Sequence, residues 1–331
     1  MISKAKLNYQ KRTAISSGTS TPQQGDPSYD CDKSAPDNLQ AMFADVIGCE
    51  KVIAKLEQFQ RVSRTLKKRN MDPRAFIPTN FVFKGPPGTG KTTTARKIAQ
   101  VYYDMGFLSK PSVIECSASD LVGKYVGNSG PKTRKLFERA IGKVLFIDEA
   151  YRLANGAGSG SSCGTGTFNS EAVSELVDLL TKPAYQGTLI VILAGYEPEM
   201  NKLLGVNPGL ARRFPEEVFF KRLDPGECLD VLKMKLRSAG IVSKVLEDRE
   251  PGMWDKLVLR VRLLARTKGW GNARDMATLA KVIARDVFVS DEMSDLEGDG
   301  GIMSCSGETV IRDFEAMLRE RRARSIVKAS Q

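Results

Sequence analysis

The chain of 331 residues contains no histidine. This absence excludes an imidazole general base, a histidine-activated nucleophile and a histidine-ligated metal. The cysteines are few and form no C-x-x-C pair, so we expect reduced, structural thiols rather than a zinc or disulfide framework. They are Cys31, Cys49, Cys116, Cys163, Cys228 and Cys305. Enzymatic chemistry would therefore depend on carboxylates, Lys, Arg, backbone amides or a bound metal ion.

Long apolar runs are missing as well. No stretch approaches the ~20 apolar residues that a membrane helix needs, and residues 1–10 lack the apolar block of a secretory signal. With 41% apolar and 27% charged residues, a chain of this length can bury roughly 75% of its unfolded surface. We expect an intracellular protein with no membrane partner, in the cytoplasm or nucleus rather than the mitochondrion.

The sequence pattern divides the chain into three parts. Residues 1–37 are rich in Ser, Thr, Gln, Lys and Pro, which predicts a disordered tail or a linker from a longer chain. In residues 38–222, apolar runs alternate with helical stretches, which predicts an α/β domain with a parallel sheet covered on both faces. In residues 223–331 the strand signals fade, which predicts an all-helical domain with an acidic, Gly-rich loop inserted at 291–306.

The apolar periodicity places individual elements within these parts. Strands are predicted at 81–83, 112–115, 144–147, 189–194 and 218–220. Helices are predicted at 50–68, 91–105, 131–140 and 169–182 in the α/β domain, and at 225–238, 251–267, 272–288 and 307–323 after it.

The net charge of +11 is concentrated in residues 38–222, which hold 26 Lys and Arg against 17 Asp and Glu. This part includes a cationic run made of Arg61, Arg64, Lys67, Lys68, Arg69 and Arg74. Such a run suits either a nucleic-acid backbone or a solvated helix face in a protein that also binds a polyphosphate. No aromatic residues interleave with these cations to stack on bases, so we favour the solvated face.

The strongest motif is GPPGTGKTT, which matches G-x-x-x-x-G-K-[ST] and lies between a predicted strand and a predicted helix. Its glycines let successive backbone N–H groups turn toward phosphate oxygens. Lys91 would reach the β- and γ-phosphates, and the Thr92 hydroxyl can ligate Mg²⁺. The predicted phosphate-binding residues are Gly85, Pro86, Pro87, Gly88, Thr89, Gly90, Lys91, Thr92 and Thr93.

A second motif, VLFIDEA, ends an apolar run in two adjacent carboxylates. It follows Lys91 by one strand–helix unit, so we expect its acidic end to face the same phosphates. Asp148 would hold Mg²⁺ through water, and Glu149 would polarise the water that attacks the γ-phosphate. The presence of both carboxylates favours hydrolysis over nucleotide binding alone.

Together with four further motifs, these segments resemble the AAA+ ATPase family, and within it the CbbX and stage V sporulation protein K group. The further motifs are DLVGKYVGNSGPKT (120–133), ILAGY (192–196), NPGLARRFP (207–215) and GWGNARDM (269–276). The resemblance covers residues 38–323. It implies a P-loop NTPase fold in which ATP and Mg²⁺ bind between an α/β domain and a helical lid, in a homo-oligomeric ring that is usually a hexamer.

The resemblance also implies roles for single residues. Ile47 and Gly48 match the segment that contacts adenine. Arg213 matches the arginine finger that one subunit offers to the γ-phosphate of its neighbour, and the adjacent Arg212 could share that role. Arg274 matches the lid arginine that contacts the γ-phosphate in its own subunit. A cation at either place would stabilise the charge that develops in the transition state.

Two glycine-containing segments resemble loops that line the central pore of protein-threading rings. In the first, Tyr125 is followed by Val126 and Gly127, and an aromatic side chain there would grip a polypeptide by packing. The second is the Gly- and Ser-rich stretch 155–169.

The sequence departs from the family at the end of the fourth predicted strand. Many members carry a polar Asn there to position the attacking water, whereas this chain has Ala194, Gly195 and Tyr196. The group that orients the water is therefore left open, with Tyr196 as a candidate.

We expect ATP hydrolysis to drive the remodelling or threading of a protein client. One alternative is a non-catalytic switch or scaffold that assembles on ATP, against which Asp148 and Glu149 count. Another is a nucleic-acid-stimulated ATPase, suggested by the cationic run alone.

Overall fold

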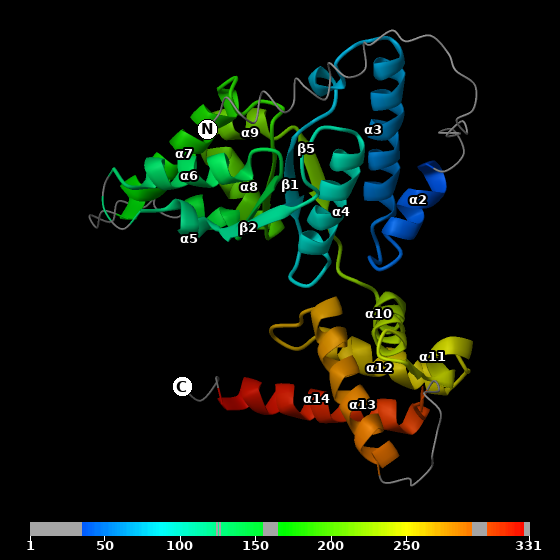
Figure 1. The fold of residues 1–331 in the computed structure, drawn as a ribbon. Coiled ribbons are helices and arrows are strands. Elements are labelled where there is room, and N and C mark those ends of the chain that lie inside the picture. The colour runs from blue at the N-terminus through cyan, green and yellow to red at the C-terminus, as the bar shows by residue number, and fades with distance from the viewer. Residues whose placement is uncertain (1–34, 124, 126, 155–164, 293–302, 328–331) are drawn as a thin grey trace, which may run out of the picture. The chain divides into compact units, whose positions relative to one another are not determined.

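The chain folds around a five-stranded parallel sheet (Figure 1). Its strands are β1 (Asn80–Lys84), β2 (Val113–Ser117), β3 (Val144–Asp148), β4 (Ile190–Gly195) and β5 (Glu216–Phe219). They lie in the order β2-β3-β4-β1-β5, and every neighbouring pair is parallel. All five predicted strands are confirmed, each with ends within two residues of the predicted ones.

The computed structural model describes residues 35–123, 125, 127–154, 165–292 and 303–327. Residues 38–331 form one compact unit. The predicted tail lies outside the described residues, except that helix α2 (Ala35–Met42) begins within it.

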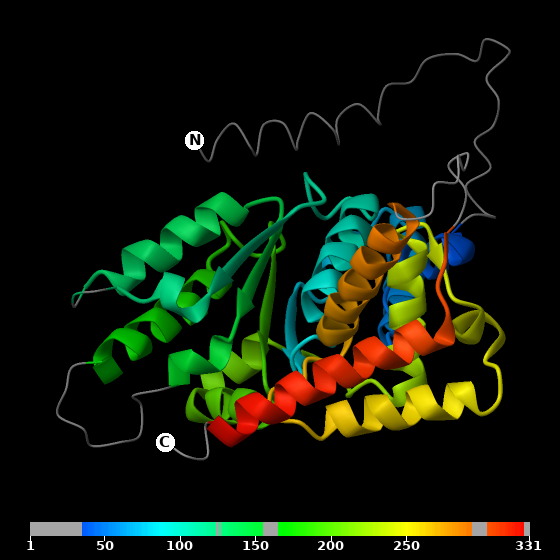
Figure 2. The ribbon, with the colours of Figure 1, turned by 90° about the horizontal axis from the view of Figure 1, so that it is seen from below.

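Helices cover both faces of the sheet (Figures 1 and 2). One face carries α3 (Glu50–Lys68) and α4 (Lys91–Asp104), which share a buried cluster with Phe81 and Phe83. Val82 points to the other face, where the helices are α5 (Ala118–Leu121), α6 (Ser129–Ala140), α7 (Thr165–Thr181), α8 (Glu197–Val206) and α9 (Pro208–Arg213). Because both faces of the sheet are buried, apolar residues occupy successive positions of the strands instead of alternating with polar ones.

Phe83, on the interior strand β1, is fully buried. Its ring lies 6.5 Å from those of Phe81 and Phe146 and 5.1 Å from that of Phe220, centroid to centroid. These rings come from β1, β3 and the residue after β5, so they hold the centre and one edge of the sheet together. The phosphate-binding motif follows directly from this strand.

The predicted helical part contains α10 (Pro225–Arg237), α11 (Lys244–Asp248), α12 (Met253–Ala265), α13 (Ala273–Glu292) and α14 (Gly307–Val327). The four predicted helices are confirmed as α10, α12, α13 and α14. Figure 2 shows α14 and α12 running side by side, and one apolar cluster joins the five helices.

This part also contains a short parallel pair, β6 (Ile241–Val242) with β7 (Met303–Ser304), which the sequence pattern did not predict. The expected loop at 291–306 is wrong at both ends, because α13 continues through Glu292 and β7 occupies Met303–Ser304. Residues 293–302 lie outside the described part. Backbone bonds from Met303 N to Gly240 O (3.0 Å) and from Cys305 N to Val242 O (2.9 Å) fix β7 in place.

The described cysteines are free thiols, as the sequence predicts. Burial raises the pKa of Cys49 and Cys305 to about 11 and that of Cys116 and Cys228 to about 12. Within the described residues, no group of three or more metal-ligating side chains forms. No helix in the same residues is long and apolar enough to cross a membrane.

We expect Phe83→Ala to lower the free energy of unfolding by about 3–5 kcal/mol, because it leaves a cavity among three rings. Phe76→Ala is the matched control: its side chain is 59% exposed, so the change should stay within about 0.5 kcal/mol. Chemical denaturation monitored by circular dichroism measures both. Equal losses in the two variants would show that the aromatic cluster does not dominate the core.

Candidate active site

A pocket of about 420 Å³ opens at the carboxyl ends of β1, β3 and β4 and continues to the helices that follow the sheet. Sixteen of its lining residues come from three sequence regions: the segment before α3, the phosphate-binding motif, and the ends of β3 and β4 with the residues after them. The rest come from α10, from the start of α13 and from Leu223, which lies between β5 and α10. Most of the predicted site residues therefore meet in one place, although they are far apart in sequence.

The phosphate-binding motif forms the tight turn that the sequence predicts between β1 and α4. Gly88 (φ 67°) and Gly90 (φ 92°) have left-handed backbones, and Gly90 caps the N-terminus of α4. Thr89 is buried, and its hydroxyl donates to Pro86 O at 2.9 Å. Such a turn directs backbone N–H groups and the positive end of a 14-residue helix at one point, where an anion is favoured.

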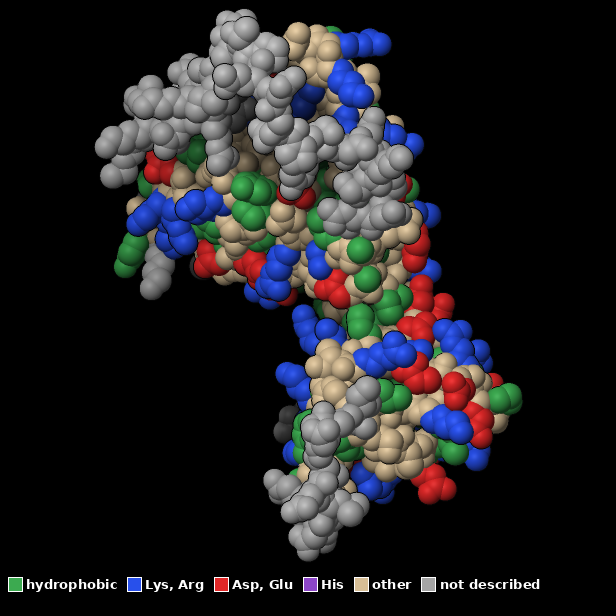
Figure 3. Space-filling view, turned by 45° about the vertical axis from the view of Figure 1, so that its right-hand side comes forward, with side chains coloured by type: hydrophobic (Ala, Val, Ile, Leu, Met, Phe, Trp, Pro, Cys, Tyr) green, Lys and Arg blue, Asp and Glu red, His purple; other side chains and the backbone are tan. Residues whose placement is uncertain are grey.

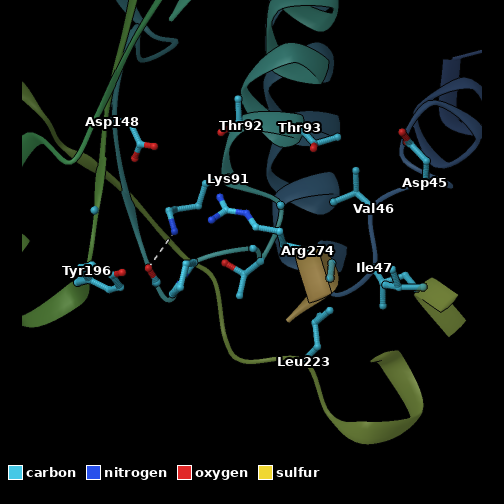
Figure 4. A pocket seen from close by; sticks show the side chains of 18 of the residues that line it. Asp45, Val46, Ile47, Lys91, Thr92, Thr93, Asp148, Tyr196, Leu223 and Arg274 are labelled. Atoms are coloured by element: carbon cyan, nitrogen blue, oxygen red, sulfur yellow. Dashed lines mark hydrogen bonds between the residues drawn. The ribbon is translucent and has the colours of Figure 1, made fainter. Parts of the chain in front are cut away.

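Lys91, the first residue of α4, reaches back over this turn. Its Nζ donates to Gly85 O at 2.9 Å (Figure 4) and to Pro86 O at 2.7 Å. Burial lowers the pKa of Lys91; Asp148 acts in the opposite direction and Arg274 in the same one. Both of these charges therefore lie within electrostatic reach of the amine, and a phosphate would replace the loop carbonyls as its acceptor.

Oxygen donors gather beside the lysine. Thr92 lies in the first turn of α4, and Asp148 is the last residue of β3; both line the pocket (Figure 4). Hydroxyl and carboxylate oxygens are the ligands that Mg²⁺ prefers, together with substrate phosphates. The donor set present here therefore fits that ion.

Glu149 adopts a left-handed backbone (φ 50°), which is costly for a residue with a side chain and is common at functional sites. Its carboxylate forms an ion pair with Arg152 (2.7 Å) and accepts a hydrogen bond from the Tyr151 hydroxyl (3.4 Å). The ring of Tyr151 lies 5.8 Å from that of Tyr196, which also lines the pocket. Two side chains thus hold the carboxylate in one orientation.

The end of the pocket near Ile47 is lined mainly by apolar side chains, with Asp45 and Lys235 beside them. Ile47 lines it together with Val46, and Leu223, Val231 and Met234 face them from the linker and α10. An apolar slot of this kind suits the flat face of a nucleobase.

Two of the predicted residues next to the pocket, Gly48 and Pro86, do not line it. Gly48 is close by, since a Cβ on it would lie 3.7 Å from the Leu223 side chain.

The helical part contacts the phosphate-binding motif directly. Ala273 N donates to Gly88 O at 3.0 Å, and Asn272 Nδ2 donates to Pro87 O at 3.0 Å. The next residue, Arg274, is exposed on α13 and lines the pocket, where its guanidinium extends toward Lys91 (Figure 4).

Arg213 does not line this pocket. It ends α9, which Asn207 caps by accepting a hydrogen bond from Leu210 N (3.0 Å). Together with Arg212 it lines a second hollow, of about 680 Å³, that also includes Asn80 at the start of β1. Asn80 Nδ2 donates to Arg213 O at 2.8 Å, so Arg213 lies near the amino ends of the parallel strands, away from the pocket at their carboxyl ends.

Tyr125 is 72% exposed. The backbone that follows it is held to α7, because Glu171 accepts hydrogen bonds from Gly127 N (3.2 Å) and Gly130 N (3.1 Å). Val126 and most of the second predicted pore loop, residues 155–164, lie outside the described residues.

Some pocket residues were missed by the sequence analysis. Val231 and Met234 are spaced three apart on the predicted helix 225–238, so its apolar face could have indicated them. Tyr151 carries no comparable signal, although it directly follows the acidic motif. Asn272 does not line the pocket but contacts the phosphate-binding motif, and it lies within GWGNARDM, a motif that was noted for Arg274.

A phosphate-binding turn after an interior strand of a parallel sheet, beside an acidic strand end, is the arrangement of P-loop nucleoside triphosphatases. Comparison with known proteins gives the particular family. Residues 81–222 match the family model described as "ATPase family associated with various cellular activities (AAA)". The chain belongs to this AAA family, and it is an ATPase.

Three relatives show where the chain falls within the family. Stage V sporulation protein K of Bacillus subtilis (strain 168) is 42% identical over 154 residues, covering 46% of this chain and 45% of that protein. The protein CfxQ homolog of Pyropia yezoensis is 31% identical over 240 residues, covering 72% and 75%. Ribulose bisphosphate carboxylase/oxygenase activase, chloroplastic, of Cyanidioschyzon merolae is 34% identical over 203 residues, covering 61% and 64%. The predicted resemblance is confirmed.

We expect Gly88→Ala to weaken nucleotide binding at least about tenfold, a loss of ~1.4 kcal/mol. The added Cβ would lie 1.9 Å from Gly271 O, at a left-handed backbone. Gly240→Ala is the matched control, since Gly240 has a similar φ (76°) and a Cβ added to it would meet no atom within 4 Å. Fluorescence titration with labelled ADP measures both. Unchanged binding in Gly88→Ala would mean that the contact with Gly271 is not needed by the pocket.

Proposed function

We propose that the chain couples hydrolysis of Mg²⁺–ATP to the remodelling of a protein client, which a homo-oligomeric ring draws past Tyr125. The observation that carries the proposal is the exposure of Tyr125 on a loop held to α7 through Glu171, in a chain whose pocket has both carboxylates. An exposed aromatic residue on an anchored loop can grip many sequences by packing alone.

The pocket residues suggest a division of roles around ATP. The backbone N–H groups of the phosphate loop and Lys91 would hold the phosphates. Thr92 and Asp148 would hold Mg²⁺, which supplies positive charge to the β- and γ-phosphates when it is bound. Ile47 and the apolar residues near it would hold the adenine.

Glu149 would accept the proton of the attacking water. Arg152 and Tyr151 hold its carboxylate in one orientation. Tyr196 lines the same pocket beside Tyr151, which supports it as the group that orients the water.

Two arginines would act on the γ-phosphate from different chains. Arg274 extends into its own pocket, whereas Arg213 lies at the opposite edge of the sheet. A site that needs both is complete only between neighbouring subunits, which supports a ring and, by resemblance, a hexamer. The name of the activase relative describes action on another enzyme, which supports a protein client.

Two residues of the cationic run make hydrogen bonds within the chain, which counts against a nucleic-acid partner. Lys67 Nζ donates to Met105 O (2.7 Å) and Arg74 donates to Gly106 O (3.2 Å), so parts of the cationic run serve the chain's own fold. On the face drawn in Figure 3, Lys and Arg side chains are interspersed with Asp and Glu over most of the described surface.

We expect ATP turnover per subunit to rise with protein concentration, because Arg213 acts from a neighbouring subunit. Arg213→Ala should remove that rise and lower the saturating rate by about 10³-fold. Arg139→Ala, which changes an exposed arginine of α6, is the control. The measurement is steady-state phosphate release from nanomolar to tens of micromolar protein. Turnover that is independent of concentration would contradict the shared site.

We expect Tyr125→Ala to abolish ATP-dependent unfolding of a fluorescent domain that carries an unstructured tail, while ATP hydrolysis continues. Tyr125→Phe is the matched control, since it keeps the ring, and Glu149→Gln should stop both unfolding and hydrolysis. Loss of fluorescence and phosphate release are followed in parallel. Threading is wrong if Tyr125→Ala unfolds the domain as fast as the wild type does.

A further inference from the structure

The turn that begins α13 lies directly against the phosphate loop. Ala273 N donates to Gly88 O (3.0 Å), and a Cβ on Gly88 would lie 1.9 Å from Gly271 O. The two backbones are therefore in contact, without a side chain between them. Any movement of the turn must carry the phosphate loop with it or break this contact.

Asn272, at the centre of this turn, is fully buried and has a left-handed backbone (φ 48°). Its Nδ2 donates to Pro87 O (3.0 Å), and its Oδ1 accepts a hydrogen bond from Leu223 N (3.3 Å). One amide thus joins three segments that are distant in sequence: the phosphate loop, the linker after β5 and the start of α13.

The chemistry of the position explains why an amide is needed. An amide supplies a donor and an acceptor at once, and asparagine tolerates the left-handed backbone better than most residues. A carboxylate there would place an acceptor against Pro87 O, which is also an acceptor. Glycine would keep the backbone conformation and lose both side-chain bonds.

We propose that Asn272 is a positioning residue that links nucleotide binding at the phosphate loop to the placement of α13. Pro87 O is held by the amide, so the loop keeps the conformation in which its N–H groups face the phosphates. Arg274, two residues later, depends on the same turn for its position in the pocket. Because such linkage is reciprocal, the nucleotide stabilises the turn as much as the turn stabilises the bound nucleotide.

The proposal depends on the ATPase pocket and is independent of any client or ring. It predicts that Asn272→Asp and Asn272→Gly each weaken ADP binding about tenfold, since a buried carbonyl loses its partner. Asn272→Gly is the variant expected to fold without backbone strain. Asn70 offers matched controls, because it is exposed and has a similar backbone (φ 56°); Asn70→Asp and Asn70→Gly should bind ADP as the wild type does.

A second readout separates positioning from stability. Trp270 is 6% exposed and lies two residues before Asn272, and Trp254→Phe leaves it as the only tryptophan. In that background, ADP should change the Trp270 emission in the Asn70 variants and leave it unchanged in the Asn272 variants. The melting temperature of each variant is measured with and without ADP.

Weaker ADP binding together with loss of the emission change would support the linkage. Wild-type ADP affinity and emission in Asn272→Gly would overturn it, whatever happens to the nucleotide-free melting temperature, because Asn272 would then serve stability alone. Failure of the wild-type chain to bind ADP would instead contradict the ATPase pocket. The experiment therefore distinguishes a failure of the pocket assignment from a failure of the role proposed for Asn272.

Discussion

The structure depends on close approach between backbones around one short loop. Gly85 and Gly88 are the points of contact: a Cβ on Gly85 would lie 2.3 Å from Phe220 O, and one on Gly88 would lie 1.9 Å from Gly271 O. The first contact fixes where β1 ends relative to the chain leaving β5, and the second fixes the start of α13. Main-chain contacts therefore position the phosphate loop of the pocket relative to the ends of both segments.

The sheet separates the nucleotide-binding residues from the proposed arginine finger. Lys91, Asp148 and Glu149 lie at the carboxyl ends of the strands, whereas Arg213 lies near their amino ends, beside the second hollow. Parallel strands make this separation unavoidable, because every strand ends at one edge and begins at the other. Under the proposed function, Arg213 at the amino ends would therefore complete the pocket of a neighbouring subunit.

The sequence predicts those parts of the structure that depend on residues close together along the chain. The apolar strands and the phosphate-binding motif are visible because burial on both faces and a tight turn each need particular residues at fixed spacing. The helices α8 and α9 were missed because they are short, and the pairing of Ile241 with Met303 joins residues far apart in sequence. The contact from Asn272 to Pro87 spans 185 positions, so no window along the sequence could have revealed it.

The loop that carries Tyr125 has a mechanical consequence. Its backbone is held by Glu171 of α7, and Arg134 of α6 forms an ion pair with Glu175 of α7 at 2.8 Å. These hydrogen bonds and this ion pair thus connect the Tyr125 loop, α6 and α7 without involving the strands of the sheet. A load applied at Tyr125 would be borne first by this pair of helices, so the nucleotide-binding edge of the sheet would be shielded from direct strain.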